Sequence, residues 1–132
     1  MLRYAPRAVP LMYTNASATM YRFVNGNYER TTFDKVCWDE STSASAAKNG
    51  MTSQYSVRVF IPYSGVALKV TPGKDLMVEG TVDFTFDNSS EQSQAESLKR
   101  LREKCGKVYS VMSCDNKTFG YRPLWHYDIL LK

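Results

Sequence analysis

The closing stretch of the chain, Lys107–Lys132, holds residue types that often do chemistry. It contains the single histidine, His126, followed by Asp128 and preceded by Cys114. A thiol activated by an imidazole that a carboxylate holds in place is the arrangement of a nucleophilic enzyme. However, Cys114 falls in or beside a predicted turn, and the sequence alone does not bring it close to His126. We interpret the stretch as a packing element and predict no catalytic residue and no enzyme activity.

The three cysteines, Cys37, Cys105 and Cys114, are widely spaced and odd in number. They form no CxxC pair and no Cys/His cluster with the spacing of zinc ligands. The sequence also lacks the motifs of a serine nucleophile elbow, a zinc-protease helix and a phosphate-binding loop. We therefore expect free, buried thiols in a reducing cytoplasm, and neither a metal nor another cofactor.

The elements that position His126 form a predicted β-hairpin. KVYSVMS is an apolar run of strand length, CDNKTFG has the residues of a turn, and LWHYDILL alternates in polarity. Successive side chains of a strand point to opposite faces, so the second strand has an aromatic and aliphatic face (Trp125, Tyr127, Ile129, Leu131). Leu124, His126 and Asp128 share the other face.

Further strands are predicted from patterns of period two. QYSVRVFI and TVDFTFD each alternate apolar and polar residues, and DLMVEG is assigned to the same strand as TVDFTFD, with a bend at Gly80. Asn25-Gly26 separates two β-rich runs and predicts a tight hairpin, because both residues tolerate positive φ. The run after this turn changes parity, which indicates a bulge near Phe33-Asp34.

One segment, SSEQSQAESLKRLREKCG, has the pattern of an amphipathic helix. Its apolar residues recur every three or four positions (Ala95, Leu98, Leu101, Cys105). Ser93 and Glu96 can form a capping box, and Gly106 can end the helix. The basic residues near its end alternate with glutamates and lie where the helix dipole favours cations, so we interpret them as a solvated face.

Together these elements predict a mainly β fold. We expect a small barrel or tight sandwich of about six strands, with one α-helix at about residues 91–105 on its outside or over one end. Residues 1–18 are expected to be an extended arm that offers Arg3, Tyr4 and Arg7 to a neighbour, and residues 19–132 a single domain. The expected core is Val57, Val59, Ile61, Val82, Phe84, Phe86, Val111, Trp125, Tyr127 and Ile129.

The order of motifs along residues 19–130 resembles that of a known family. An aromatic hairpin runs into V-x-W, then come VFIPYS, D-L-M-V-E-G-T-V-D-F (Asp75–Phe84), a short helix, V-x-S-V-x-S-x-D and N-K-T-F-G-x-x-x-L-W-H-Y. These resemble small tailed-bacteriophage proteins encoded in the head-to-tail region of the genome. Members carry D-x-I-V-x-G-x-I-D-F in the middle and I-x-S-V-D-x-x-x-x-G-S-x-x-L-x-H-W near the end.

The resemblance implies a structural virion protein of the head-completion, or stopper, type. Such proteins form a homo-oligomeric ring below the portal and its adaptor, extend the DNA channel without reading the DNA sequence, and dock the tail. It implies localisation in the neck of the virion after assembly in the cytoplasm of a host bacterium. The net charge of +4 is compatible with a DNA conduit, and no apolar run approaches the ~20 residues that cross a bilayer.

Two segments are predicted to be long loops. Residues 39–53 are small and polar, and residues 62–75 hold two prolines and two glycines. A connection of this length is either functional or simply mobile, and both interpretations stand for residues 39–53. In the functional case the loop projects into the ring's lumen or onto the next subunit, through Ser41, Ser43, Ser45, Lys48, Asn49 and Met51.

Two alternatives to a stopper are kept. The first is another neck or tail ring protein, such as an adaptor or a tail terminator. The second is a small barrel that binds single-stranded nucleic acid, which needs exposed aromatic rings in a basic groove. Phe60, Tyr63 and Tyr121 are the candidate stacking residues, although Asp83 and Asp87 weaken this interpretation.

Overall fold

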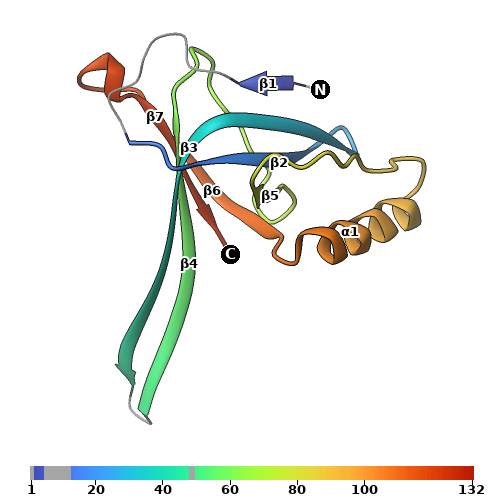
Figure 1. Ribbon diagram of the computed structural model, residues 1–132, viewed down its shortest axis with the longest axis horizontal. Coiled ribbons are helices and arrows are strands. Elements are labelled where there is room, and N and C mark those ends of the chain that lie inside the picture. The colour runs from blue at the N-terminus through green and yellow to red at the C-terminus, as the bar shows by residue number, and fades with distance from the viewer. Residues whose placement is uncertain (1, 5–12, 48–49) are drawn as a thin grey trace.

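The computed structural model describes the backbone of residues 2–4, 13–47 and 50–132 and the side chains of residues 13–40 and 56–132. Its elements are β1 (Leu2–Tyr4), β2 (Ala16–Val24), β3 (Asn27–Ala47), β4 (Gly50–Pro62), β5 (Leu76–Glu79), α1 (Glu91–Cys105), β6 (Tyr109–Lys117), the short 3₁₀-helix η1 (Arg122–Leu124) and β7 (His126–Leu131) (Figure 1).

Six of the strands close into an antiparallel β-barrel. They follow the order β3-β2-β5-β6-β7-β4, and β4 pairs back with β3. The remaining strand, β1, lies parallel to β3. The predicted mainly β barrel with one helix at residues 91–105 is therefore confirmed. The closing hairpin is present as β6 and β7, although β6 continues through Lys117 into the predicted turn.

The β2–β3 hairpin has the predicted turn and bulge. Asn25 and Gly26 have φ of 52° and 82°, the left-handed values that an Asn-Gly turn requires. Ala18 pairs with Phe33 but Ala16 pairs with Val36, so β3 carries one extra residue between these two pairs. This bulge restores the parity of β3, because the side chains of Phe33, Val36 and Trp38 all enter the same core.

The barrel interior and the space under α1 are two separate cores. The interior contains apolar side chains from all six barrel strands, β2 to β7. The outer core packs Tyr21, Leu76, Val78 and Phe86 against Leu101 of α1. Of the predicted core residues, seven are buried (Val57, Val59, Ile61, Phe86, Val111, Tyr127, Ile129). The other three, Val82, Phe84 and Trp125, are only half-buried.

The strand predicted for TVDFTFD is wrong, because residues 81–88 are extended but form no ladder. Strand β5 ends at Glu79, and the next residue, Gly80, turns the chain away from the sheet with a φ of 91°. Side chains then take the place of a neighbouring strand: the Val82 amide donates to Thr19 Oγ1 at 3.0 Å, and Arg30 Nε donates to the Val82 carbonyl at 2.7 Å. The predicted alternation of burial holds, since the polar residues of this segment are exposed.

Two details of the helix prediction are also wrong. The N-cap is Ser90, whose hydroxyl accepts from the Ser93 amide at 3.1 Å, so Ser93 does not cap the helix with Glu96. Ala95 is exposed and Ser97 is buried in its place, because the Ser97 hydroxyl accepts the Asp87 amide at 3.0 Å. The end at Gly106 is confirmed by its φ of 77° and its hydrogen bond to the Arg102 carbonyl.

The loop predicted for residues 39–53 is wrong as well. Strand β3 continues to Ala47 and β4 begins at Gly50, so the small polar residues form a long antiparallel ribbon. Serine, threonine and alanine show no alternation of apolar and polar side chains from which a strand could be predicted. Their backbone groups nevertheless pair as those of any strand. Of the second predicted loop, residues 62–75, Pro62 belongs to β4 and residues 63–75 contain no helix or strand, as predicted. The predicted arm contributes β1 and the start of β2 at Ala16, and residues 5–12 lie outside the described part.

Asp75 joins three segments of the barrel wall. Its side chain is buried, one carboxylate oxygen accepts the Phe23 amide at 2.8 Å, and the other accepts the Thr71 amide at 2.9 Å. Its backbone carbonyl accepts the Val111 amide at 2.8 Å. The carboxylate thus ties the end of β2 to the loop before β5.

Replacing Asp75 by alanine should destabilise the fold by about 3 kcal/mol, because hydrogen bonds to a buried charged acceptor are lost and two amides are left without it. Urea unfolding followed by tryptophan fluorescence measures this. Asp115→Ala is the matched control: its carboxylate is largely exposed, so its loss should cost less than about 1 kcal/mol. Equal effects of the two substitutions would contradict the assigned role of Asp75.

The two tryptophans should differ in their contribution to stability. Trp38 is 6% exposed, lies in the barrel core and packs against the Tyr109 ring at a centroid distance of 5.7 Å. Trp125, by contrast, is half-buried against Tyr63. We expect Trp38→Ala to cost about 3–5 kcal/mol and Trp125→Ala about 1–2 kcal/mol. Chemical denaturation of the two variants decides this, and the reverse order would contradict the assignment of the core.

Candidate interaction surfaces

His126 and Cys114 lie in separate environments. In the β6–β7 ladder His126 pairs with Lys117, whereas Cys114 pairs with Ile129. His126 Nδ1 lies 2.9 Å from the Leu124 carbonyl, and the Cys114 thiol points to the Leu68 carbonyl at 3.7 Å. Burial raises the pKa of the Cys114 thiol to about 11, so the reactive thiolate is disfavoured. The two residues therefore make no nucleophile–base pair in this structure.

The described residues hold no group of three or more His, Cys, Asp or Glu side chains arranged for a metal ion. Cys37, Cys105 and Cys114 are free thiols, but all three are half-buried and not buried as predicted. None of the helices in this part of the chain has the length and apolar character of a membrane span.

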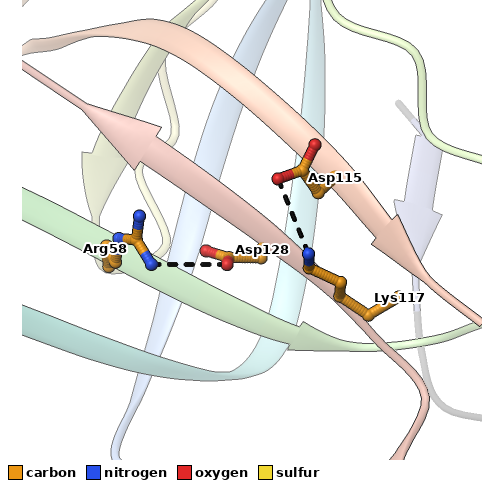
Figure 2. Close-up of polar contacts among 4 residues, drawn as sticks. All are labelled: Arg58, Asp115, Lys117 and Asp128. Carbon is orange, nitrogen blue, oxygen red and sulfur yellow. Dashed lines mark ion pairs between the residues drawn. The ribbon is translucent and has the colours of Figure 1, made fainter.

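A ladder of charged residues crosses the outer face of β4, β7 and β6. Asp115 and Asp128 are register partners, so two carboxylates face each other across the strands. Each has its own cation: Arg58 lies 3.5 Å from Asp128, and Lys117 lies 3.8 Å from Asp115 (Figure 2). Because each carboxylate has its own cation, the four charges sum to zero and the ladder is a neutral barrel face rather than a focused acidic or basic site.

The β3–β4 ribbon projects from the barrel (Figure 1). Its pairing runs from Cys37 and Phe60 to Ala47 and Gly50, while the pairing of β4 with β7 ends at Val57 and Leu131. Beyond Val57 the ribbon has only two strands, and no third strand pairs with it anywhere in the described chain. At about 3.3 Å per residue, Ser41–Ala47 extends it by about 20 Å past the barrel.

The edges of this ribbon lack the features that usually protect strand edges. Natural proteins place charges, prolines or bulges on exposed edges to prevent pairing with another chain. Residues 41–56 contain one charged residue, Lys48, and no proline. The pairing from Ser41 to Ala47 has no shift of register, so no bulge twists the edge away. The ribbon therefore presents two regular, uncharged edges.

A second surface is the connection between β6 and β7. Phe119, Tyr121 and Leu124 are 74%, 65% and 48% exposed. These side chains line one open pocket together with Lys117, Gly120 and His126. The connection is held in shape by Trp125, whose indole N–H donates to the Gly120 carbonyl at 3.2 Å and whose ring lies under the Arg122 guanidinium. We call Phe119, Tyr121 and Leu124 the aromatic loop.

The ribbon and the aromatic loop lie at opposite ends of the barrel, as Figure 1 shows by the positions of the short helical turn before β7 and of the far end of β3. Strand β4 connects them, because it begins in the ribbon at Gly50 and reaches His126 through Pro62. The two ends of β4 therefore lie at two surfaces of different composition, one with small polar residues and one with exposed aromatic rings.

The predicted interaction residues are distributed as follows. Ser41, Ser43 and Ser45 alternate along β3, and Met51 is in β4, so all four belong to the ribbon. Lys48 and Asn49 lie outside the described residues. Arg3 and Tyr4 form part of β1, and Arg7 also lies outside the described residues. The two described arm residues do not pair with the ribbon, since β1 pairs with Thr31–Phe33.

Of the predicted stacking residues, only Tyr121 is exposed. Phe60 packs its ring against the edge of His126, and Tyr63 contacts Trp125 and Tyr127. Sequence reasoning missed Phe119 and Leu124, which it assigned to a turn and to a strand face. The signal that could have indicated them is three large apolar residues within six positions of a segment rich in turn residues.

Residues 13–131 match the model of a family of unknown function (DUF6751). The chain belongs to this family. No curated protein and no solved structure matches it significantly.

The Cys114 thiol should be a poor nucleophile. At pH 8 a thiol with a pKa of about 11 has a roughly hundredfold smaller thiolate fraction than one at the ordinary value of 9.0. Iodoacetamide labelling of the folded protein, followed by mass spectrometry, should therefore modify Cys114 far more slowly than the same residue in urea. Preferential labelling of Cys114 in the folded protein would indicate an activated thiol and would contradict the structural role.

Proposed function

We propose that this protein is a head-completion, or stopper, protein of a tailed bacteriophage. In this proposal copies of the chain form a ring below the portal and adaptor, extend the DNA channel and dock the tail. The resemblance of the motif order along residues 19–130 supports the class. The observation that carries the assembly is the projecting β3–β4 ribbon, which beyond Val57 joins no third strand in the described part of the chain.

A ribbon of this kind is incomplete as a structural unit. An isolated two-stranded hairpin is marginally stable in water, and three or more strands with a packed face are needed for independent stability. In the described chain the ribbon beyond Val57 has no third strand, and its composition holds only two large side chains of apolar character, Met51 and Tyr55, which are too few for a packed face. A neighbouring subunit can supply both, by pairing with an edge and by covering the small side chains at close approach.

Ring formation requires a contact between two different surfaces of the same chain, repeated by a rotation that closes. The ribbon supports such a contact because it reaches about 20 Å beyond its own barrel, as far as the body of an adjacent copy. Its small residues also suit a crowded axis where several copies converge. In the ring the ribbon lies against the next subunit or lines the lumen.

The aromatic loop supports a second, different contact. Exposed aromatic rings beside a basic side chain are typical of the centre of a protein–protein interface. Its position at the barrel end opposite the ribbon leaves it free for a protein above or below the ring, such as the adaptor or the tail. An adaptor or tail terminator would use the same two surfaces, so the position in the neck is part of the proposal.

The aromatic loop also favours one other function, binding of single-stranded nucleic acid. Phe119 and Tyr121 are exposed near Lys117 and Arg122, and bases stack on such rings. The basic groove that would follow a nucleic-acid backbone is less well supported. On the adjoining barrel face Arg58 and Lys117 each pair with a carboxylate. We therefore place this function second.

The experiment is removal of the ribbon without disturbing the barrel. Thr42–Tyr55 is replaced by Asn-Gly, so that the pair Ser41↔Ser56 closes a two-residue turn as Val24↔Asn27 does in the β2–β3 hairpin. The variant should keep the circular dichroism and thermal midpoint of the barrel, because every pair of β4 with β7 is retained. It should fail to form rings, in solution or on portal complexes, by mass photometry and negative-stain microscopy.

A matched control separates the two surfaces and the two functions. The double variant Phe119→Ser with Tyr121→Ser should still form rings but lose attachment of the tail or adaptor. If a folded ribbon-deletion variant assembled rings and gave particles that retain DNA, the proposed function would be wrong. Tight, salt-dependent binding of single-stranded DNA that survives ribbon deletion and is lost in the double variant would establish the second function instead.

A further inference from the structure

The outer edge of β3 carries an added strand. Leu2, Arg3 and Tyr4 pair in parallel with Thr31, Thr32 and Phe33. On its other edge this part of β3 pairs with β2. Strand β4 does not reach it, because the β3–β4 pairing begins at Cys37. In the described chain, β1 therefore pairs with the outer edge of β3 at Thr31–Phe33 and nowhere else.

The segment that connects β1 to β2 is longer than pairing of β1 within its own chain requires. The order β1-β3-β2 places β1 and β2 two strand spacings apart, about 10 Å, and Phe33 lies only three residues from Val36, which faces Ala16. The chain between Tyr4 and Ala16 is residues 5–15, which can span up to about 35–40 Å. This length exceeds what the intramolecular path needs by more than about 10 Å.

Exchange of this strand between copies would conserve every backbone pair. Each subunit would donate its own Leu2–Tyr4 and receive the same segment on its Thr31–Phe33 edge, which is the general basis of domain swapping. Three residues of parallel ladder hold the strand weakly on its own. In a ring, however, the Thr31–Phe33 edge of the adjacent copy is held close by and so has a high effective concentration. The weakly held strand can therefore pair with that edge instead.

We propose that in the assembled protein Leu2–Tyr4 of one copy adds to the Thr31–Phe33 edge of the adjacent copy. The occupant of this edge is then a second copy of the same chain, and the contact adds to that of the ribbon. The inference rests on the proposed ring, and it assigns the N-terminal segment the role of a strap between subunits. It predicts that the edge is filled within one chain in the monomer and between chains in the assembly.

The experiment uses a photoreactive benzophenone amino acid at Arg3 in the otherwise native chain. Unlabelled and ¹⁵N-labelled protein are mixed in equal amounts before assembly, alone or on portal complexes, and the monomer and the oligomer are irradiated separately. Mass spectrometry identifies peptides that join position 3 to Thr31–Lys35. In the oligomer, pairs that combine a labelled with an unlabelled peptide should be as frequent as uniform pairs. In the monomer only uniform pairs should occur.

The matched control places the same amino acid at Lys99, which is exposed on α1 and should give no link to Thr31–Lys35. A chain that lacks residues 2–4 provides a second measurement: its rings should form but dissociate at lower salt or denaturant than the native rings. If assembled rings gave only uniform pairs, the exchange would be wrong while the ring remained. If the native chain formed no oligomer, both the ring and the exchange would be wrong.

Discussion

The barrel depends on one strand that pairs with two different partners along its length. Strand β3 pairs with β2 up to Val36 and with β4 from Cys37 onward. At the changeover the backbone groups of Trp38 would face an edge that β2 no longer covers. Asn15 supplies that missing neighbour: its side-chain amide donates to the Trp38 carbonyl at 3.2 Å and accepts the Trp38 amide at 2.8 Å. With the bulge before Val36, this contact lets one strand turn the corner and close the barrel.

Several other side chains also take over the role of a strand. Asp75 accepts backbone amides from Phe23 and Thr71, and Asn88 both accepts from and donates to the Tyr28 backbone. Buried backbone groups must be paired, and such contacts satisfy them where no ladder continues. They let the chain after Gly80 cross the outside of the barrel as an extended segment. α1 then covers this segment and forms the outer core.

A structural feature could be predicted from the sequence where the residue types themselves impose the backbone conformation or the burial. Asn25-Gly26 demands positive φ, and the alternation in β4 and β7 follows from burial of one face, so both were readable locally. Asn15 and Asp75 were not, because their partners lie 23 and 52 residues away. Residues 81–87 alternate as a strand does because one face meets α1, although no strand pairs with them. The polarity pattern reports burial and not hydrogen bonding.

The same distinction applies to the candidate surfaces. The β3–β4 ribbon could not be predicted from residue types, since small polar side chains indicate neither a strand nor a loop, and its backbone pairing is set by the strands that continue into it. Its special character was nevertheless visible in the composition, as a stretch of small polar residues too long for a simple connection. Trp125 was assigned to the core from its alternation with Tyr127 and Ile129. It lies just before β7, where the ring supports the aromatic loop instead of filling the barrel.

The closed barrel is complete without the ribbon, the aromatic loop and β1, and this separation bears on how assembly is timed. In the proposed ring, ordering of a two-stranded ribbon and of a three-residue strand costs free energy that only the contacts between subunits offset. The proposal therefore predicts that isolated copies associate weakly. A template that gathers several copies raises their effective concentration and offsets that cost at one place. In the proposed function a portal with its adaptor is such a template, and the marginal stability of the ribbon would then confine ring formation to a head that is ready for closure.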